Sequence, residues 1–360
     1  MPTMVKGTAE EASMWVTMRE DMERREHELL APEATFADAS RGREHPEEPD
    51  LLRTCFQQDR DRILHSKSFR RLANKTQVFL APEGDHYRTR LTHTLEVSQV
   101  ACAIARPLGL NVDLTEAIAL GHDLGHTPFG HAGERALRAA RARYRGIDPA
   151  SSEGQDLFRH NQQSVRIVRL LERDGKGLNL TLEVMDGMCC HTGPLPAMTP
   201  EGRIVARADR IAYVVHDIDD AERAGLLSEA DLPTAACEVL GRTASQRLET
   251  MVQDVVRTSA EEGDIAMSER VWQALMEMRT FLYDNLYLQG DAKSEEPKAE
   301  HVLTGLFRHF VNHLDEVPGE YRLHDDAPDV QVADYLSSMT DRYAIRLYEH
   351  LNVPKGWSLR

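Results

Sequence analysis

The amino-acid sequence predicts a soluble, mostly α-helical protein. Helix-forming residues dominate almost throughout, and alternating apolar and polar runs of the kind that form strands are scarce. The main hairpin dipeptide, Asp186-Gly187, lies among helix-forming residues. Hydrophobic residues make up 41% and charged residues 28% of the chain, as in globular proteins. No apolar run reaches the roughly 18 residues of a membrane-spanning helix.

The first part of the chain predicts helices separated by short breaks. Residues 1–50 are polar and charged and predict one helix followed by extended chain. Residues 60–79 begin as an amphipathic helix and end in an extended stretch, and residues 81–90 form a loop. Residues 91–110 predict a helix that ends near Pro107.

The next helix is expected at residues 113–126, with Asp113 or Thr115 as its N-cap. Glycines around Pro128 then interrupt the helical pattern. After a polar segment, further helices are expected at 159–172 and 204–227.

The regions between and after these helices complete the organisation. Residues 193–202 and the acidic, lysine-containing stretch 289–300 predict loops. No repeat, low-complexity tract or clear linker divides the chain. We therefore expect one helical domain with terminal additions: a charged helix and extended segment at 1–50, a core at 51–290, and a C-terminal helical region packed on the core at 291–360.

Charge and cysteine content limit the classes of function. The net charge of −16 argues against broad binding to DNA or RNA, which relies on a basic surface, but not against a polyanionic small molecule in a local positive pocket. The five cysteines are odd in number and lack framework spacing, which indicates reduced thiols in a cytoplasm. The N-terminus has no signal-peptide pattern, so we expect a cytoplasmic protein without a membrane partner.

The stretch GHDLGHTPFGHAGE, residues 121–134, holds three histidines and two carboxylates. Burying so many polar side chains is costly unless each finds a partner, and a hydrolytic metal site provides one. His122 and Asp123 can reach one ion at the edge of a helix, with His93 and Asp209 as third and fourth ligands.

A lone His-Asp pair is more often a surface or capping dipeptide. Here it follows an apolar run in a glycine-punctuated stretch, and His126, His131 and Glu134 lie close behind it. That context favours the metal site.

Several motifs together resemble those of the bacterial deoxyguanosine-triphosphate triphosphohydrolases and their dNTPase-like relatives, within the HD-domain phosphohydrolases. The resemblance covers about residues 25–290 and is carried, in order, by RDRILHSKSFRRLANKTQVF, RTRLTHTLEV, GHDLGHTPFGHAGE, HNQQSVRIV and ADRIAYVVHDIDDA. It implies an HD-domain helical fold, with the HD core at 51–290 and additional helices at both ends.

The resemblance also implies a reaction and a cofactor. The family splits a deoxynucleoside triphosphate (dNTP) into deoxynucleoside and intact tripolyphosphate, with water attacking the α-phosphorus. By position, His93, His122, Asp123 and Asp209 would bind a divalent metal. Mn²⁺ and Mg²⁺ are expected first, and the same donor set suits Fe²⁺, Co²⁺ or Ni²⁺.

The resemblance assigns the acid–base chemistry to a second set of residues. His131 and Glu134 match the catalytic pair near the α-phosphate, and His126 and His160 match histidines that line the phosphate site. His131 can move a proton while Glu134 orients it. The sequence leaves open whether metal hydroxide or a water activated by His131 and Glu134 is the nucleophile.

Substrate contacts are expected along one helix face. Asp209, Tyr213 and Asp217 stand at i, i+4 and i+8 and therefore share a face. The resemblance implies that Tyr213 packs on the deoxyribose, that Asp217 accepts a hydrogen bond from the 3′-hydroxyl, and that Gln77 also contacts the sugar. Close packing at C2′ would exclude ribonucleotides.

Basic residues complete the expected site. Arg90 matches a phosphate contact of the family, and Arg210 adjoins Asp209, where relatives vary. Four other histidines are interpreted as structural and left out of the site: His65, His86, His191 and His216.

Other functions and partners stay open at this point. One alternative is an HD-type nucleotidase or phosphodiesterase acting on nucleoside monophosphates or cyclic nucleotides. Another is a single-stranded nucleic-acid-binding protein or nuclease, against which the charge argues. A nucleotide sensor without turnover is disfavoured by the complete set of site residues. The resemblance also implies a homo-oligomer, with a hexamer favoured, and a second dNTP bound at an allosteric site. The base preference is undetermined.

Overall fold

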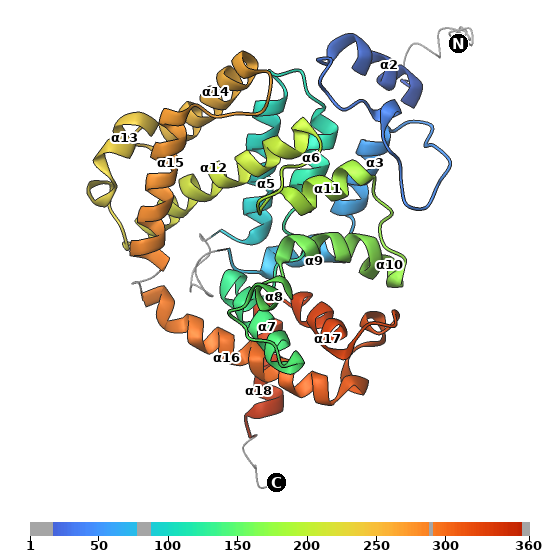
Figure 1. The fold of residues 1–360 in the computed structure, drawn as a ribbon, viewed down its shortest axis with the longest axis vertical. Coiled ribbons are helices and arrows are strands. Elements are labelled where there is room, and N and C mark those ends of the chain that lie inside the picture. Colours follow the sequence, from blue (N-terminus) through green and yellow to red (C-terminus); the bar gives the residue numbers. More distant parts are fainter. Residues whose placement is uncertain (1–16, 78–87, 288–290, 355–360) are drawn as a thin grey trace, which may run out of the picture.

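The computed structural model describes residues 17–77, 88–287 and 291–354, and this part of the chain is built from helices (Figure 1). The mostly α-helical prediction is confirmed. The only β-type pairing among the described residues is two isolated bridges, Arg43 with Thr181 and Thr76 with Thr89. None of the described helices is both long enough and apolar enough to cross a membrane.

The helices before the long central helix are short to medium in length. In chain order they are α2 (Arg19–Leu29), α3 (Cys55–Leu64), α4 (Lys67–Arg71), α5 (Arg90–Ala105), α6 (Val112–Gly121), α7 (Gly130–Arg145), α8 (Ser152–Asp156), α9 (His160–Arg166), α10 (Glu172–Gly175) and α11 (Leu182–Cys190).

The second half contains the longest helices. They are α12 (Pro200–Arg223), α13 (Thr234–Leu240), α14 (Ala244–Glu262), α15 (Glu269–Leu282), α16 (Asp291–Asn312), α17 (Pro328–Ser337) and α18 (Asp341–Asn352).

The larger hydrophobic core lies among α5, α6, α11 and α12. Helix α12 packs on α5, α6 and α11, α3 packs across α6, and α14 and α15 lie against α12 (Figure 1). Ile118 on α6 and Ile211 and Val214 on α12 are fully buried in this core. Burying such side chains stabilises the fold by about 1.5–3 kcal/mol each.

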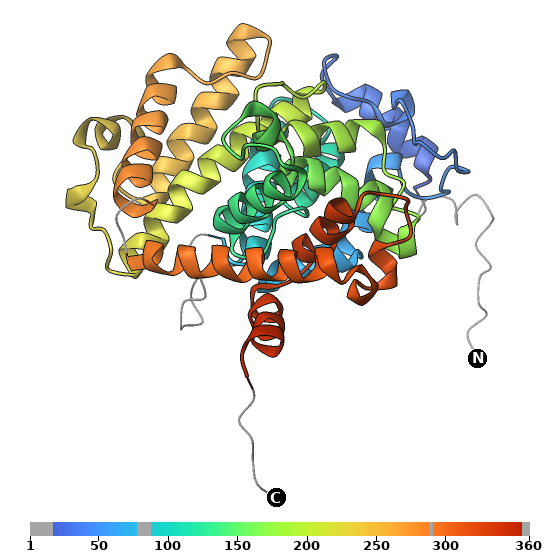
Figure 2. The ribbon, with the colours of Figure 1, turned by 60° about the horizontal axis from the view of Figure 1, so that its bottom comes forward.

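A second core joins α7 to the C-terminal helices. Helix α16 packs along α7 and contacts α17 and α18, with Leu137, Leu303 and Phe307 buried between them. Figure 2 shows α16 running across one side of the body and α18 extending away from it. The segment between α6 and α7 therefore connects the two cores.

Helix α6 differs from its prediction at both ends. The N-cap is Asn111, whose side-chain oxygen accepts a hydrogen bond from Leu114 N at 3.2 Å, so the prediction of Asp113 or Thr115 is wrong. The helix ends at Gly121, before the His-Asp pair, which lies in a turn. The pair is thus held at a helix C-terminus rather than within a helix.

The prediction of a loop at 289–300 is wrong from Asp291 onward, because α16 begins there. Residues 288–290 lie outside the described part of the chain. Its acidic side chains form ion pairs with α7: Arg135 Nη2 lies 2.6 Å from Glu296 Oε2 and 3.4 Å from Glu300 Oε1. Pro297 lies within the first two turns of the helix. The charge run is therefore a paired helix face and not a solvated loop.

The turn after α6 packs directly on the backbone of α9, and Gly125 permits this. A Cβ atom at this position would lie 2.2 Å from Ser164 N and 2.3 Å from His160 O. Gly125 N donates to Ser164 Oγ at 2.8 Å, and Ser164 Oγ donates to His122 O at 2.7 Å. This contact fixes the turn against α9.

Gly125→Ala should therefore destabilise the protein by about 1–3 kcal/mol or more, because the methyl group meets backbone atoms that cannot rotate away. Gly319→Ala is the matched control, since a Cβ atom there would meet nothing within 4 Å. Its effect should stay within about 0.5 kcal/mol. Urea unfolding of both variants measures the difference, and equal stabilities would contradict the close approach.

Candidate active site

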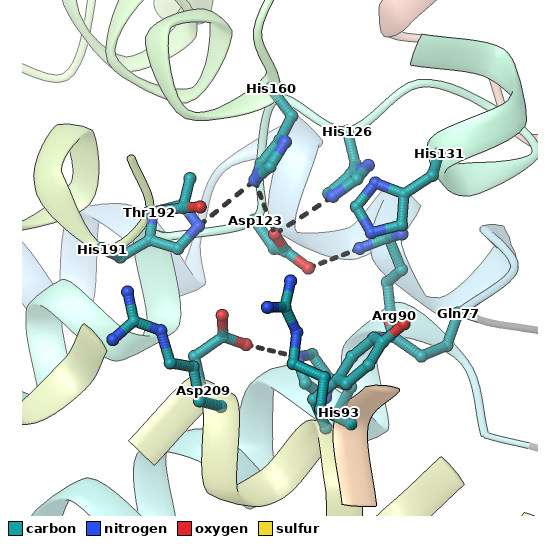
Figure 3. A pocket seen from close by; sticks show the side chains of 13 residues that line it. Gln77, Arg90, His93, Asp123, His126, His131, His160, His191, Thr192 and Asp209 are labelled. Atoms are coloured by element: carbon teal, nitrogen blue, oxygen red, sulfur yellow. Dashed lines mark hydrogen bonds and ion pairs between the residues drawn. The ribbon is translucent and has the colours of Figure 1, made fainter. Parts of the chain in front are cut away.

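One cavity collects most of the predicted site residues (Figure 3). They come from the loop before α5, from α5, from the turn after α6, and from α7, α9 and α12. The predicted residues that line it are Gln77, Arg90, His93, Asp123, His126, His131, His160, Asp209, Arg210 and Tyr213. The other three predicted residues, His122, Glu134 and Asp217, are buried.

The four predicted metal ligands converge on one wall of this cavity. His93 Nε2 lies 3.1 Å from Asp209 Oδ1. His122 Nε2 lies 3.8 Å from the same Asp209 oxygen and 3.7 Å from Asp123 Oδ1. Helix α5, the turn after α6 and the later helix α12 thus bring two imidazoles and two carboxylates together.

The ring of His122 is oriented as in a metal ligand. Its Nδ1 donates a hydrogen bond to Ala119 O at 2.6 Å, which turns Nε2 toward the two carboxylates. That Nε2 atom is buried and has no hydrogen-bond partner among the described residues. A buried imidazole nitrogen without a hydrogen-bond partner that faces two carboxylates fits a site for a divalent cation.

Asp123 is shared between this ligand set and a buried arginine. Arg90 Nη1 donates to Asp123 Oδ2 at 2.6 Å, and both side chains are almost fully buried. Burial opposes ionisation, but His126, His122 and Arg90 outweigh it and hold the pKa of Asp123 well below its usual value. The carboxylate therefore stays charged, with Oδ1 directed at the histidines.

The opposite wall of the cavity is a cluster of histidines around Glu134. The rings of His126 and His160 stack with centroids 4.0 Å apart, and His131 meets His126 edge-on. Glu134 Oε2 lies 3.0 Å from His160 Nδ1 and 3.6 Å from His131 Nδ1. His160, whose side chain is 12% exposed, is thus the nearer partner of Glu134, while the His131 side chain is 56% exposed.

The charges of this pair follow from their contact. Burial raises the pKa of Glu134, but His160 and His131 outweigh that effect and lower it. Burial lowers the pKa of His160, but Glu134 outweighs that effect and raises it. The carboxylate and the imidazole therefore stabilise each other's charged forms, and as a pair they add no net charge to this wall.

The predicted substrate residues divide into two groups. Arg210 and Tyr213 lie on α12 beside Asp209 and line the cavity, and Gln77 lines it from the other side. Asp217 lies two turns along α12 from Asp209 and is not among the described residues that line this cavity. Gln77 Oε1 is buried without a hydrogen-bond partner in the described part of the chain.

The structure adds residues that the sequence interpretation missed. His191, interpreted as structural, lines the cavity together with Thr192 and Arg279. His191 Nε2 lies 3.3 Å from His160 Nε2, and burial is the main cause that lowers the pKa of His191 to about 4. His191 Nδ1 donates to Met188 O at 2.7 Å.

The sequence contained one signal for His191, namely its place directly after an apolar helical stretch. Like His122, it directly follows an apolar helix and bonds through Nδ1 to the carbonyl three residues earlier. Of the other histidines set aside, His65 is exposed and His216 lies against Glu96, both outside the cavity, and His86 lies outside the described residues.

His122→Ala should weaken divalent-metal binding at least about tenfold, because it removes a pre-oriented ligand. His65→Ala is the control, since this exposed histidine lies outside the cavity. Metal content after dialysis, measured by mass spectrometry, tests this. Wild-type metal content in His122→Ala would remove the residue from the metal site.

Comparisons with known proteins match two parts of the chain to protein families. Residues 90–214 match the HD domain, and residues 265–350 match the phosphohydrolase-associated domain. A relative from Caldanaerobacter subterraneus, named deoxyguanosinetriphosphate triphosphohydrolase-like protein, is 49% identical over 94% of this chain and 97% of its own.

Two further relatives carry the same name. The protein from Clostridium perfringens is 46% identical over 94% of this chain and 98% of its own length. The protein from Ruegeria is 38% identical over 90% and 99%. A crystal structure of a hypothetical protein from Aquifex aeolicus aligns with a TM-score of 0.41 and 18% identity over 80% of this chain and 67% of that one, too slight a likeness to carry an argument.

Proposed function

Because the chain belongs to the deoxyguanosinetriphosphate triphosphohydrolase-like family of HD-domain phosphohydrolases, we propose that it hydrolyses dNTPs to deoxynucleoside and tripolyphosphate. Water attacks the α-phosphorus in this reaction. The observation that carries the proposal is the convergence of two histidines and two aspartates at a cavity whose opposite wall is a cluster of histidines around Glu134. HD domains bind divalent metals, and this cluster has the donors for one.

His93, His122, Asp123 and Asp209 would hold the metal ion, Mn²⁺ or Mg²⁺ first. A bound divalent ion supplies two things to such chemistry, a lowered pKa of bound water and neutralised phosphate charge. Arg90 orients Asp123 through the 2.6 Å hydrogen bond and has further N–H groups, on Nε and Nη2, without partners among the described residues.

The cationic groups of the cavity suit the triphosphate. Arg90, Arg210 and Arg279 line it. Burial and Arg90 hold the pKa of His126 well below its usual value, so this ring faces Asp123 as a neutral imidazole beside His160. The net charge of −16 makes this local positive charge a specific feature of the cavity. Several cations along one cavity match a ligand with several phosphates better than a monophosphate.

His131 and Glu134 perform the proton transfer at the reacting phosphate. His131 is accessible at the cavity, so its imidazole can take a proton from water or give one to the leaving 5′-oxygen. Glu134 holds the ring through the 3.6 Å contact and also holds His160. His160 as a cation stabilises negative charge on the phosphate.

Tyr213, Asp217 and Gln77 would bind the sugar. Tyr213 packs on the deoxyribose and leaves no room for a 2′-hydroxyl, and Asp217 accepts from the 3′-hydroxyl. The family likeness supports these roles. A homo-oligomer, with a hexamer first, and an activating dNTP at a second site belong to the same proposal.

A product analysis tests the proposed function. The protein is incubated with Mn²⁺ and each dNTP, singly and mixed, and the products are separated by ion exchange. Deoxynucleoside and tripolyphosphate in equal amounts are expected. Monophosphate with pyrophosphate, or turnover of nucleoside monophosphates or cyclic nucleotides alone, would overturn the proposal in favour of another HD-type activity.

Glu134→Gln should lower kcat by about 10²–10⁴-fold and leave bound metal unchanged. The neutral amide lacks the negative charge with which Glu134 orients His131 and shares its proton. Glu172→Gln is the matched control. Glu172 is also buried and accepts hydrogen bonds from Ser68 N and Ser68 Oγ, at 2.8 and 2.7 Å, away from the cavity. Steady-state kinetics with wild-type kcat in Glu134→Gln would remove this residue from the mechanism.

Tyr213→Ala should lower the preference for dNTP over NTP by at least about tenfold in kcat/KM, because the ring no longer fills the space at C2′. Tyr213→Phe, which keeps the ring, should retain the preference. Competition assays with paired deoxy- and ribonucleotides measure it. Unchanged discrimination in Tyr213→Ala would contradict the steric exclusion.

A further inference from the structure

The turn that leads into α7 is strained and carries the acid–base residues. Phe129 has φ 62° and ψ 24°, a left-handed conformation that a phenylalanine seldom adopts, and Gly130 follows with φ 55°. Such residues persist only where surrounding contacts hold them. His131 and Glu134 lie in the first turns of this helix, so a relaxed turn would move both.

Asp341, the first residue of α18, holds this turn. Its Oδ1 accepts a hydrogen bond from Phe129 N at 3.0 Å. Its Oδ2 accepts from Thr76 N at 2.9 Å and from Thr76 Oγ1. The carboxylate is buried, and it joins the turn to the segment that leads to Gln77.

Lys75 holds the other end of the same segment. Its Nζ donates to His126 O at 2.6 Å and to Ser337 O, at the end of α17, at 2.8 Å. The residue is 2% exposed, and the partners of its Nζ are these two backbone carbonyls. A buried amine is costly, so its place here depends on the two backbone carbonyls that it bridges.

The C-terminal helices also contact α9, the helix that begins with His160 on the same wall of the cavity. Asp334 of α17 accepts hydrogen bonds from Gln163 Nε2 and from Arg166 Nε, both at 2.8 Å. Both donors lie on α9, the helix that begins with His160. The segments that carry Glu134 and His160 are therefore both anchored on the region from α17 to the start of α18.

We infer that Lys75 and Asp341 are positioning residues, through which the C-terminal helices hold the turn of Phe129 and thereby the pair His131 and Glu134 opposite Asp123. Neither residue lines the cavity, so each acts through the turn and not through substrate. The inference rests on the proposed function for its effect on rate. Its structural part, the clamp on the turn, is measurable without turnover.

The test compares Asp341→Ala, Asp341→Asn and Lys75→Met with a matched control, Asp254→Ala. Asp254 is equally buried and accepts from Ser268 N and Ser268 Oγ, at 2.8 and 2.7 Å, at the start of α15. Four quantities are measured on the full chain: amide hydrogen exchange by mass spectrometry, bound Mn²⁺, Tm, and kcat and KM for dNTP hydrolysis.

Asp341→Ala and Lys75→Met should raise amide exchange in peptides from residues 124–137 and leave bound Mn²⁺ unchanged. Their kcat should fall by about 10²-fold, because small displacements of oriented groups have effects of this size. KM should change by less than about threefold. Asp341→Asn should recover part of both effects, since its Oδ1 still accepts from Phe129 N. Asp254→Ala should lower Tm without affecting the exchange of these peptides or kcat.

Wild-type kcat and exchange in Asp341→Ala and Lys75→Met would overturn the inference. The inference would also be overturned if Asp254→Ala lowered kcat and raised exchange to the same extent at an equal change in Tm, since a structural role alone would then explain the effects. If the wild-type protein hydrolyses no dNTP, the proposed function fails, and exchange decides the clamp by itself. Raised exchange confined to residues 124–137 would then support it, and unchanged exchange would overturn it.

Discussion

The carboxylate of Asp123 is the constraint on which the rest of the site depends. One of its oxygens accepts from Arg90, and the other faces His122, His126 and His160 at 3.7, 3.5 and 4.0 Å. A buried carboxylate is costly unless it is paired and hydrogen-bonded, so each neighbour must be held in place. Helix α5 supplies the arginine, the turn after α6 supplies the carboxylate, and α9 supplies the distal histidine. The packing of these helices is therefore the packing that the site needs.

The cavity lies between two hydrophobic cores, and one core supports each of its two sets of residues. The larger core packs α5, α6 and α12 together, and the proposed metal ligands lie on α5, on α12 and in the turn after α6. The second core packs α7 against α16 and the helices after it, and α7 carries the proposed acid–base pair. The C-terminal region, which matches the phosphohydrolase-associated domain, thus belongs to the architecture of the site.

The sequence was most informative where the residues of a site lie close together along the chain. The dominance of helix-forming residues was enough to predict the helical class, and the cluster at 121–134 indicated the site. The family resemblance supplied most of the other residues that meet in the cavity. It was least informative where the meaning lies in contacts between distant segments. His191 lacks a neighbouring acid in sequence and meets His160 only after α9 and α11 pack. Asp341 lies 212 residues from Phe129 along the chain, and no local pattern relates them.

Charge runs misled the prediction for a related reason. The sequence predicts a loop for the acidic stretch that begins α16, because partners such as Arg135 on α7 are not visible in the sequence.

The central claim is that His93, His122, Asp123 and Asp209 form one metal site, and crystals grown with Mn²⁺ test it most directly. The account predicts an anomalous-scattering peak bonded to these four side chains. A peak held instead by Glu134 and the histidines near it would contradict the account.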